Sequence, residues 1–333
     1  MGSSTTTRIR LAAPEDAGLI AAAVHRCYGS TYVHPAAADP DRLAAEIRAG
    51  DVAYALAFSA DSDQHLGQVA LFRVGGAAWE VGRAVVHPEH RSAGICNLLS
   101  DALIHDYAPA RGLRLVTGHI VTTHTFVQQY ALSRGFVLTG MLLGMVPETL
   151  SPAGIPPCSQ PGSILMGIKP LAPSSRRRGV RLAGADGARV LALLRQLRIP
   201  ARQVPSGNRF ASLAGRCVVH EHLGVRHISY SPEGEDGPDP LLESVGTDQR
   251  ATWADVPFEH PEAGALVERL REQGFGWGAV IPGLGRNGED VLRLQRLEND
   301  LRLDREAIKV LDPYRGLRDE VFSDVTTRQG VCA

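Results

Sequence analysis

The stretch Trp79-Glu-Val-Gly-Arg-Ala-Val-Val-His-Pro-Glu-His-Arg-Ser-Ala-Gly-Ile-Cys-Asn-Leu-Leu99 decides how the rest of the chain is interpreted. A strand-like run ends at Pro88, the short basic turn Arg91-Ser-Ala-Gly94 follows, and an apolar helix begins at once. The unpaired N–H groups of a first helical turn and the positive end of the helix dipole point at one spot. Gly94 lets a ligand approach the backbone, and Arg91 adds positive charge. The stretch therefore predicts a phosphate or pyrophosphate site; the alternative is an ordinary strand-to-helix connection.

The run Val86-His-Pro-Glu-His-Arg91-Ser-Ala-Gly94-Ile-Cys96 resembles the acyl-CoA signature of the GNAT superfamily of N-acyltransferases, V-x-P-x-x-[RQ]-x-x-G-x-[GA]. The pair Gly135-Phe136 after a helix is similar to a later landmark of that family. Cys96 departs from the usual Gly or Ala, but a thiol is only slightly larger than a methyl group. The resemblance covers about half the chain and implies acyl-CoA as donor substrate. The residues that it implies for the donor are Val86, Arg91, Ser92, Ala93, Gly94, Ile95 and Cys96.

The elements around this stretch predict an α/β (α+β) fold with a mixed, mostly antiparallel twisted sheet flanked by helices. The order of elements from Arg8 to Lys169 is similar to the GNAT layout. Helical spacing of apolar residues and period-two runs separate the two kinds of element. We expect helices over about 14–27, 41–49, 92–110 and 123–134, and strands over about 9–12, 52–59, 66–74, 79–87, 113–121, 137–146 and 163–168.

The resemblance implies direct acyl transfer from acyl-CoA to an amine, which needs a base for the amine and an acid for the leaving thiolate. Glu80 stands six residues before the motif valine, where the family often has its base. The usual tyrosine acid is replaced by Ala131, with Tyr130 one residue away. His124 at the start of a helix and His119 on the preceding strand are the candidates to replace it, because imidazole titrates near neutrality. His124 could instead cap or pack at the helix start.

The loop after the first helix carries Tyr28, Tyr32 and His34, which could frame an amine or a planar acceptor. The alternative is a loop that packs over the domain edge. Trp79 and the proline-rich segment 147–161 are expected to form the opposite wall, and His119 could also contact the acceptor. A small-molecule amine, such as an antibiotic or a biosynthetic intermediate, is the expected acceptor.

The second half of the sequence indicates a degenerate internal repeat of the first half. We expect a GNAT domain over 1–171, a linker over 172–179 with three consecutive arginines, and a degenerate GNAT-like domain over 180–333. The ending Leu-Arg-Glu-Gln-Gly-Phe275 echoes Leu-Ser-Arg-Gly-Phe136, about 140 residues apart. The acidic, turn-rich run 231–240 replaces a cradle, so this half should not bind CoA. The string Gly283-Leu-Gly-Arg-Asn-Gly288 precedes a strand and predicts a hairpin turn. The domain is expected to complete the substrate cleft or to mediate homodimer contacts.

Composition excludes several classes of protein. With 333 residues, Lys+Arg 35 and Asp+Glu 36, the net charge is -1, so no basic field favours nucleic acid. The five cysteines form no C-x-x-C pair, so neither a disulfide framework nor a zinc ribbon is expected, and no metal cofactor is predicted. No apolar run is long enough for a membrane span, and the chain is expected to be cytoplasmic.

Two alternative functions remain open: a non-catalytic acyl-CoA sensor, and a transferase whose donor is a carrier protein or an aminoacyl-tRNA.

Overall fold

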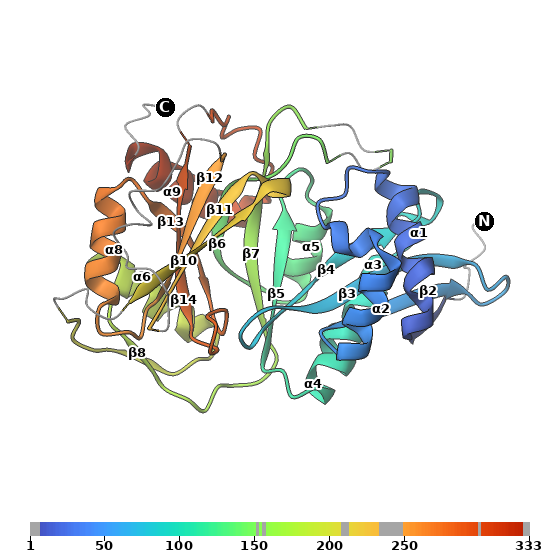
Figure 1. Ribbon diagram of the computed structural model, residues 1–333, viewed down its shortest axis with the longest axis horizontal. Coiled ribbons are helices and arrows are strands. Elements are labelled where there is room, and N and C mark those ends of the chain that lie inside the picture. Colours follow the sequence, from blue (N-terminus) through green and yellow to red (C-terminus); the bar gives the residue numbers. More distant parts are fainter. Residues whose placement is uncertain are drawn as a thin grey trace. The chain divides into compact units, whose positions relative to one another are not determined.

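A computed structural model describes residues 7–150, 153–154, 158–207, 213–232, 249–298 and 301–328. The chain divides into two compact units. The first unit consists of 1–74, 79–118 and 148–159, and the second of 75–78, 119–147 and 160–333. The predicted fold class is confirmed: the structure is a mixed α/β arrangement of mostly antiparallel strands with helices packed on them (Figure 1).

The strands of the first unit follow the order β1-β2-β3-β4-β5. The pairs β1–β2 and β2–β3 are antiparallel, whereas β4 and β5 are parallel, with Glu80 opposite Thr117. Parallel pairing next to an antiparallel meander brings the ends of β4 and β5 to one edge of the sheet. The bounds are β1 Thr7–Leu11, β2 Val52–Ser59, β3 His65–Gly75, β4 Ala78–Val86 and β5 Leu115–Val121; the β3–β4 turn and the last residues of β5 belong to the second unit.

The helices of the first unit pack apolar faces on this sheet. Helix α1 (Ala17–Tyr28) and helix α2 (Pro40–Ala49) enclose a core with β2 and β3 that includes Ile20, Leu43 and Leu56. The predicted helix 92–110 begins only at Ile95, as α3 (Ile95–Asp101). It continues through a π-helical segment, Ala102–Tyr107, into α4 (Ala108–Ala110). Pro109 lacks an N–H and crowds the preceding turn, which is a physical cause for the widening.

The strands of the second unit follow the order β7-β6-β13-β14-β12-β11-β10. Two antiparallel hairpins, β6–β7 and β13–β14, meet where β6 and β13 pair at Gly140 and Ala279. Farther along, β11 and β12 are parallel, as β4 and β5 are. The bounds are β6 Val137–Val146, β7 Gly162–Pro170, β10 Ala214–His220, β11 Val225–Ser231, β12 Ala251–Pro257, β13 Gly276–Ile281 and β14 Val291–Leu297; a separate parallel pair consists of β8 Arg178–Val180 and β9 Ala201–Gln203.

The helices of the second unit are α5 Phe126–Ser133, α6 Gly184–Gln196, α8 Ala263–Glu272 and α9 Arg315–Arg328. Helix α9 lies so close to β13 that a Cβ at Gly276 would stand 2.6 Å from the Val325 side chain. Arg271 of α8 donates to Asp186 and Asp324 at 2.6 Å each and so ties three helices together. Among the described residues, no helix has the length and apolar character that a membrane span requires.

The similar segments 132–136 and 270–275 form the same kind of helix-to-strand connection in the two halves of the chain. The amide of Phe136 donates to the Ala131 carbonyl and that of Phe275 to the Leu270 carbonyl, at 3.0 Å in both cases. Gly135 and Gly274 precede them with φ of +67° and +85°. In both cases a glycine in the left-handed region ends the helix and turns the chain into a strand. The two halves thus share this connection as well as the parallel pair.

Three details differ from the sequence expectations. The sequence predicts a helix that ends at Gly274-Phe275 and a strand over 290–297 but no strand between them, because the glycines there resemble turn signals; β13 uses these glycines for close strand packing. It also predicts a charged helical tail after Leu297, and in the described part of that tail the helical elements are α9 and a short 3-10 turn at Asp312–Tyr314. The compact units do not divide at 172–179, because β6, which forms a hairpin with β7, pairs with β13 of the second half. The sequence domains 1–171 and 180–333 remain a prediction.

The contact between β6 and β13 leads to a test of stability. A Cβ at Gly140 would lie 1.8 Å from the Gly278 carbonyl oxygen and 2.6 Å from the Ala279 Cα. We expect Gly140→Ala to lower the free energy of unfolding by about 3 kcal/mol, because the two backbones must separate. Gly316→Ala is the matched control in the same unit, since nothing lies within 4 Å of its added Cβ. Chemical denaturation measures both, and equal stabilities of the two variants would contradict the close-contact explanation.

Candidate functional site

The turn after β4 has the backbone of an anion cradle. A 3-10 turn, Pro88–His90, follows the strand, and Ser92 and Gly94 then adopt φ of +69° and +76°. The first bond into helix α3 runs from the Leu98 amide to the Gly94 carbonyl at 3.1 Å. The amides of residues 95–97 precede it and carry the positive end of the helix dipole. No atom lies within 4 Å of a Cβ built on Gly94, so a ligand could approach the backbone there.

Arg91 is fixed by the segment that follows β6. Its guanidinium donates to the carbonyl of Ala153, and the Ala153 amide donates to the Cys27 carbonyl at 2.7 Å. These bonds tie the cradle, the end of α1 and residues 153–154 together within the first unit. Pro152, Pro156 and Pro157 of the predicted proline-rich wall lie outside the described residues.

Cys96 lies on the first turn of α3 and is suited to packing. Burial raises the pKa of its thiol, although a hydrogen bond with Ser100 opposes this shift. The thiol is therefore protonated at neutral pH and is a poor nucleophile. This agrees with an acyl transfer that passes through no covalent enzyme intermediate.

Glu80 lies on β4 and is only 5% exposed. It is opposite Thr117 of β5, whose hydroxyl donates to the Trp79 carbonyl at 3.1 Å. The neighbouring Gly82 leaves room beside the carboxylate: a Cβ there would lie 3.1 Å from Glu80 Oε1. A carboxylate held at the parallel pair can accept a proton from an amine that reaches this edge.

The predicted acceptor loop gathers its aromatic side chains beside Glu80. The ring centroids of Tyr28 and Tyr32 are 4.7 Å apart, and those of Tyr32 and His34 are 5.8 Å apart. His34 reaches the Phe72 ring of β3 at 6.5 Å. We call Tyr28, Tyr32, His34 and Phe72 the aromatic group.

The hydroxyls of the aromatic group remain protonated at neutral pH. Burial raises the pKa of Tyr28 to about 12 and that of Tyr32 well above its usual value. The negative charge of Glu80 contributes to the Tyr32 shift, so this hydroxyl lies in the field of the Glu80 carboxylate. The group therefore places mutually inclined aromatic rings and neutral polar atoms next to one buried acid.

The sequence interpretation missed Phe72, Arg83 and Tyr54. Arg83 lies over the Phe72 ring at 4.3 Å, and its guanidinium donates toward the Tyr54 hydroxyl at 3.5 Å. Strict alternation along β4 places Arg83 on the face opposite Glu80. Its φ of +50° breaks that alternation, and no residue type in the sequence signals it.

Trp79 lies elsewhere than expected. It is buried, and the guanidinium carbons of Arg73 and Arg111 each lie 5.7 Å from its ring. Because Trp79 precedes Glu80 on a strand, its side chain points to the other face of the sheet. It packs in the core and does not join the aromatic group.

The two histidine candidates belong to the second unit. His119 is a partly exposed residue near the end of β5. His124 precedes α5, whose N-cap residue is Thr125, and its ring lies 5.3 Å from Phe126. Burial, and then the charge of Lys309, lower the pKa of His124, so its imidazole is mostly neutral at pH 7. The structure thus groups Glu80, the aromatic group and the cradle in one unit, and His119 and His124 in the other.

The position of the missing tyrosine acid is part of the core. Ala131 is buried within α5. Tyr130 packs against Phe136 with ring centroids 6.4 Å apart, and the Arg134 guanidinium lies 5.4 Å from the Tyr130 ring. Tyr130 is thus engaged with the end of its own helix.

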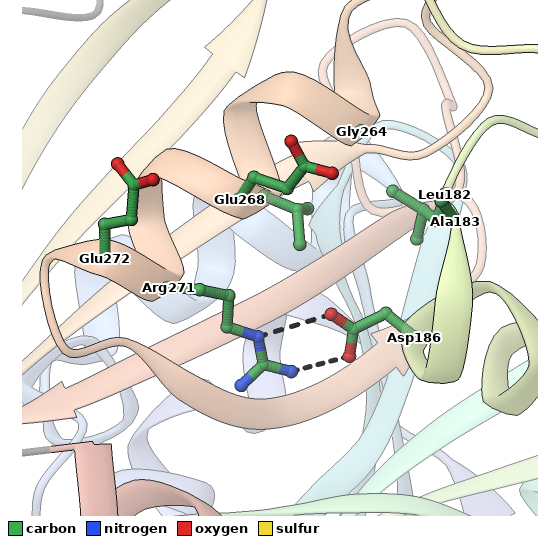
Figure 2. A pocket seen from close by; sticks show the side chains of 8 residues that line it. Leu182, Ala183, Asp186, Gly264, Glu268, Arg271 and Glu272 are labelled. Carbon is green, nitrogen blue, oxygen red and sulfur yellow. Dashed lines mark hydrogen bonds and ion pairs between the residues drawn. The ribbon is translucent and has the colours of Figure 1, made fainter.

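A hollow of about 290 Å³ lies between α6 and α8 of the second unit (Figure 2). Figure 2 shows Arg271 directed at Asp186, while Glu268 and Glu272 extend from the same helix. Glu268 and Glu272 are exposed, and the charge of Arg271 is matched by Asp186 and Asp324. This hollow therefore presents negative charge and does not suit the phosphates of CoA.

Other sequence interpretations of the second unit have mixed outcomes. Residues 283–288 form the turn between the antiparallel strands β13 and β14, so the predicted hairpin is confirmed. Most of the acidic run 231–240 lies outside the described residues.

No group of His, Cys, Asp and Glu with metal-binding geometry occurs in the described part of the chain. Cys27, Cys96, Cys158 and Cys217 are free thiols.

Comparisons with known proteins give similarities among solved structures. A scan of protein families finds no match, and neither does a search of curated proteins. The ribosomal-protein-S5-alanine acetyltransferase of Vibrio fischeri is 17% identical, with 49% of this chain and 92% of that chain covered at a TM-score of 0.38. A Desulfovibrio desulfuricans protein described as a candidate GNAT-family acetyltransferase is 16% identical, with 50% and 100% covered at 0.38.

A third solved structure is the dodecameric spermidine N-acetyltransferase of Vibrio cholerae. It is 14% identical, with 50% of this chain and 95% of that chain covered at a TM-score of 0.38. Each of these proteins matches about half of this chain.

Proposed function

We propose that this chain is a GNAT-type N-acyltransferase that moves an acetyl or other acyl group from acyl-CoA to a primary amine of a small molecule. The observation that carries the proposal is that one strand, β4, holds the buried Glu80 and leads directly into the open cradle at residues 91–97. Glu80 and Val86 lie six residues apart on β4, so the carboxylate and the cradle are well separated along the strand. That separation suits a donor whose phosphates and acyl group lie at opposite ends of a long arm.

The proposed reaction is a direct transfer in a ternary complex. The amine nitrogen attacks the thioester carbonyl, its proton passes to the Glu80 carboxylate, directly or through water, and the C–S bond breaks to release CoA thiolate. The cradle amides and Arg91 hold the phosphates, while the aromatic group orients the acceptor. A water supplies the proton that the thiolate takes up, and His124 is the residue that we propose to orient it. Release of free thiol from acetyl-CoA in the presence of an amine panel separates this function from a non-catalytic acyl-CoA sensor.

A first test concerns the cradle. Gly94→Phe should weaken acetyl-CoA binding at least about 10-fold, because it fills an open position and opposes φ of +76°. Gly112→Phe is the matched control, since Gly112 has φ of +71°, open surroundings and no place in the cradle. Isothermal calorimetry gives affinity and stoichiometry. Unchanged affinity in Gly94→Phe, or two CoA molecules per chain, would refute the assignment.

A second test concerns Glu80 as base. Glu80→Gln should lower turnover by about 10² or more and leave acetyl-CoA affinity unchanged, because general-base contributions are of that order. Glu89→Gln, an exposed glutamate of the same segment, should behave as wild type. Steady-state rates at several pH values provide the measurement. If Glu80→Gln turns over as fast as wild type from about pH 6 to 9, Glu80 has no part in proton transfer.

A third test concerns His124. Because its pKa is lowered, the neutral imidazole predominates at and above pH 7 and can orient the water that protonates the thiolate. His124→Ala should therefore depress the high-pH limb of the rate profile about 10-fold or more without changing acetyl-CoA affinity. His105→Ala, a surface histidine beside Asp101, is the control. A folded His124→Ala variant with the wild-type profile would show that the thiolate leaves without this residue.

A further inference from the structure

Arg83 has three features that ordinary surface arginines lack. Its φ of +50° is in a region that L-residues rarely adopt, and such strain clusters at functional sites. Its side chain is only 11% exposed. Its guanidinium carbon lies 4.3 Å from the centre of the Phe72 ring, so the cation lies over one member of the aromatic group.

The hydrogen bonds of Arg83 leave part of its guanidinium unused. Nη1 donates to Glu46 at 3.2 Å and toward the Tyr54 hydroxyl at 3.5 Å. Nε is buried and has no hydrogen-bond acceptor among the described residues. Burying an N–H of a charged group without an acceptor costs free energy. A ligand that accepts a hydrogen bond from this N–H would recover that free energy.

Glu80 and Arg83 flank the same ring. A Cβ at Gly82 would lie 3.1 Å from Glu80 Oε1 and 3.4 Å from Phe72 Cε1, so the carboxylate and the ring are separated only by the empty side of Gly82. The Tyr32 hydroxyl lies in the fields of both Glu80 and Arg83. The carboxylate of Glu80 and the guanidinium of Arg83 thus both lie beside the Phe72 ring, in the same unit.

We infer that the acceptor carries a carboxylate close to its amine, as an α-amino acid does, and that Arg83 binds this carboxylate. The inference rests on the proposed acyl transfer and names the substrate class of that site. The ammonium of a zwitterion is attracted to Glu80 and its carboxylate to the unused donors of Arg83. An amine without a carboxylate would leave those donors unpaired, so the site discriminates against it.

The test uses matched acceptors with the full-length protein and acetyl-CoA. The common α-amino acids are supplied one at a time, each as the free acid and as the primary amide, and thiol release is followed. For the best side chain, kcat/KM should be about 10- to 100-fold higher for the acid than for the amide, which is the range expected for a hydrogen bond to a charged group. No preference for any acid over its amide would overturn the inference.

Variants separate recognition from a structural role. Arg83→Gln should raise KM for the acid far more than for the amide and bring the acid-to-amide ratio close to one, with acetyl-CoA affinity unchanged. Glu46→Gln and Tyr54→Phe remove the internal partners of Arg83 but keep the guanidinium, so they should retain the acid preference. If Arg83→Gln keeps the ratio, or lowers acid and amide equally, the carboxylate is not bound by Arg83.

Direct binding distinguishes failure of this inference from failure of the proposed function. Calorimetric titration of wild type and Arg83→Gln with the same acids and amides needs no turnover. If acids bind through Arg83 but no acyl transfer occurs, the inference holds and the transferase assignment fails. If amides are acylated as well as acids and neither binds through Arg83, the transferase assignment holds and the inference fails. If nothing binds and nothing is acylated, both fail.

Discussion

The irregular course of β4 and the turn after it is the constraint on which the candidate site depends. A regular strand would alternate its side chains between two faces, and a regular helix start would leave no open cradle. Positive φ at Arg83 turns that side chain onto Phe72, and positive φ at Ser92 and Gly94 opens the amides of the next helix. Only Gly94 tolerates such a φ without cost. The neighbouring contacts of Arg83 with Glu46 and Tyr54 stabilise one of the strained positions.

The parts of the fold that were predictable are those with strong local patterns. Strands β2 and β6 have the predicted bounds, because each is an apolar run between clear turn signals. Glu80 and the loop aromatics were expected near the site, and period-two geometry and helix ends are local properties. Arg83 and strand β13 were missed, because a positive φ and the use of glycine for close packing depend on partners far away in the sequence. The β6–β13 pairing was not expected for the same reason, since it joins residues about 140 positions apart.

The second unit has the same local topology, a parallel pair of strands with a buried carboxylate, but its carboxylate is engaged differently. Its parallel pair β11–β12 also has a buried carboxylate, Asp255, opposite Ser229. Arg293 donates to both oxygens of Asp255 at 2.7 and 2.8 Å, and His227 lies 2.7 Å from Oδ2. Although burial opposes it, the charges of Arg293 and His227 hold the pKa of Asp255 far below its usual value. This carboxylate is fully engaged and cannot act as a base at neutral pH.

The two buried carboxylates differ in how the protein engages them, and this difference suits Asp255 to a structural role. A buried acid that is matched by a bidentate arginine fixes its neighbours, and removing one partner would leave an unpaired charge. Glu80 has Gly82 and the aromatic group beside it, and the nearby guanidinium of Arg83 is directed to Glu46 and Tyr54. In the first unit Arg83 is paired with Glu46 and its buried Nε has no acceptor among the described residues, whereas in the second unit Nε and Nη2 of Arg293 both donate to Asp255. Of these two arginines, Arg83 keeps a donor for the carboxylate of the zwitterionic ligand that we propose, because the Nε and Nη2 donors of Arg293 are already taken up by Asp255.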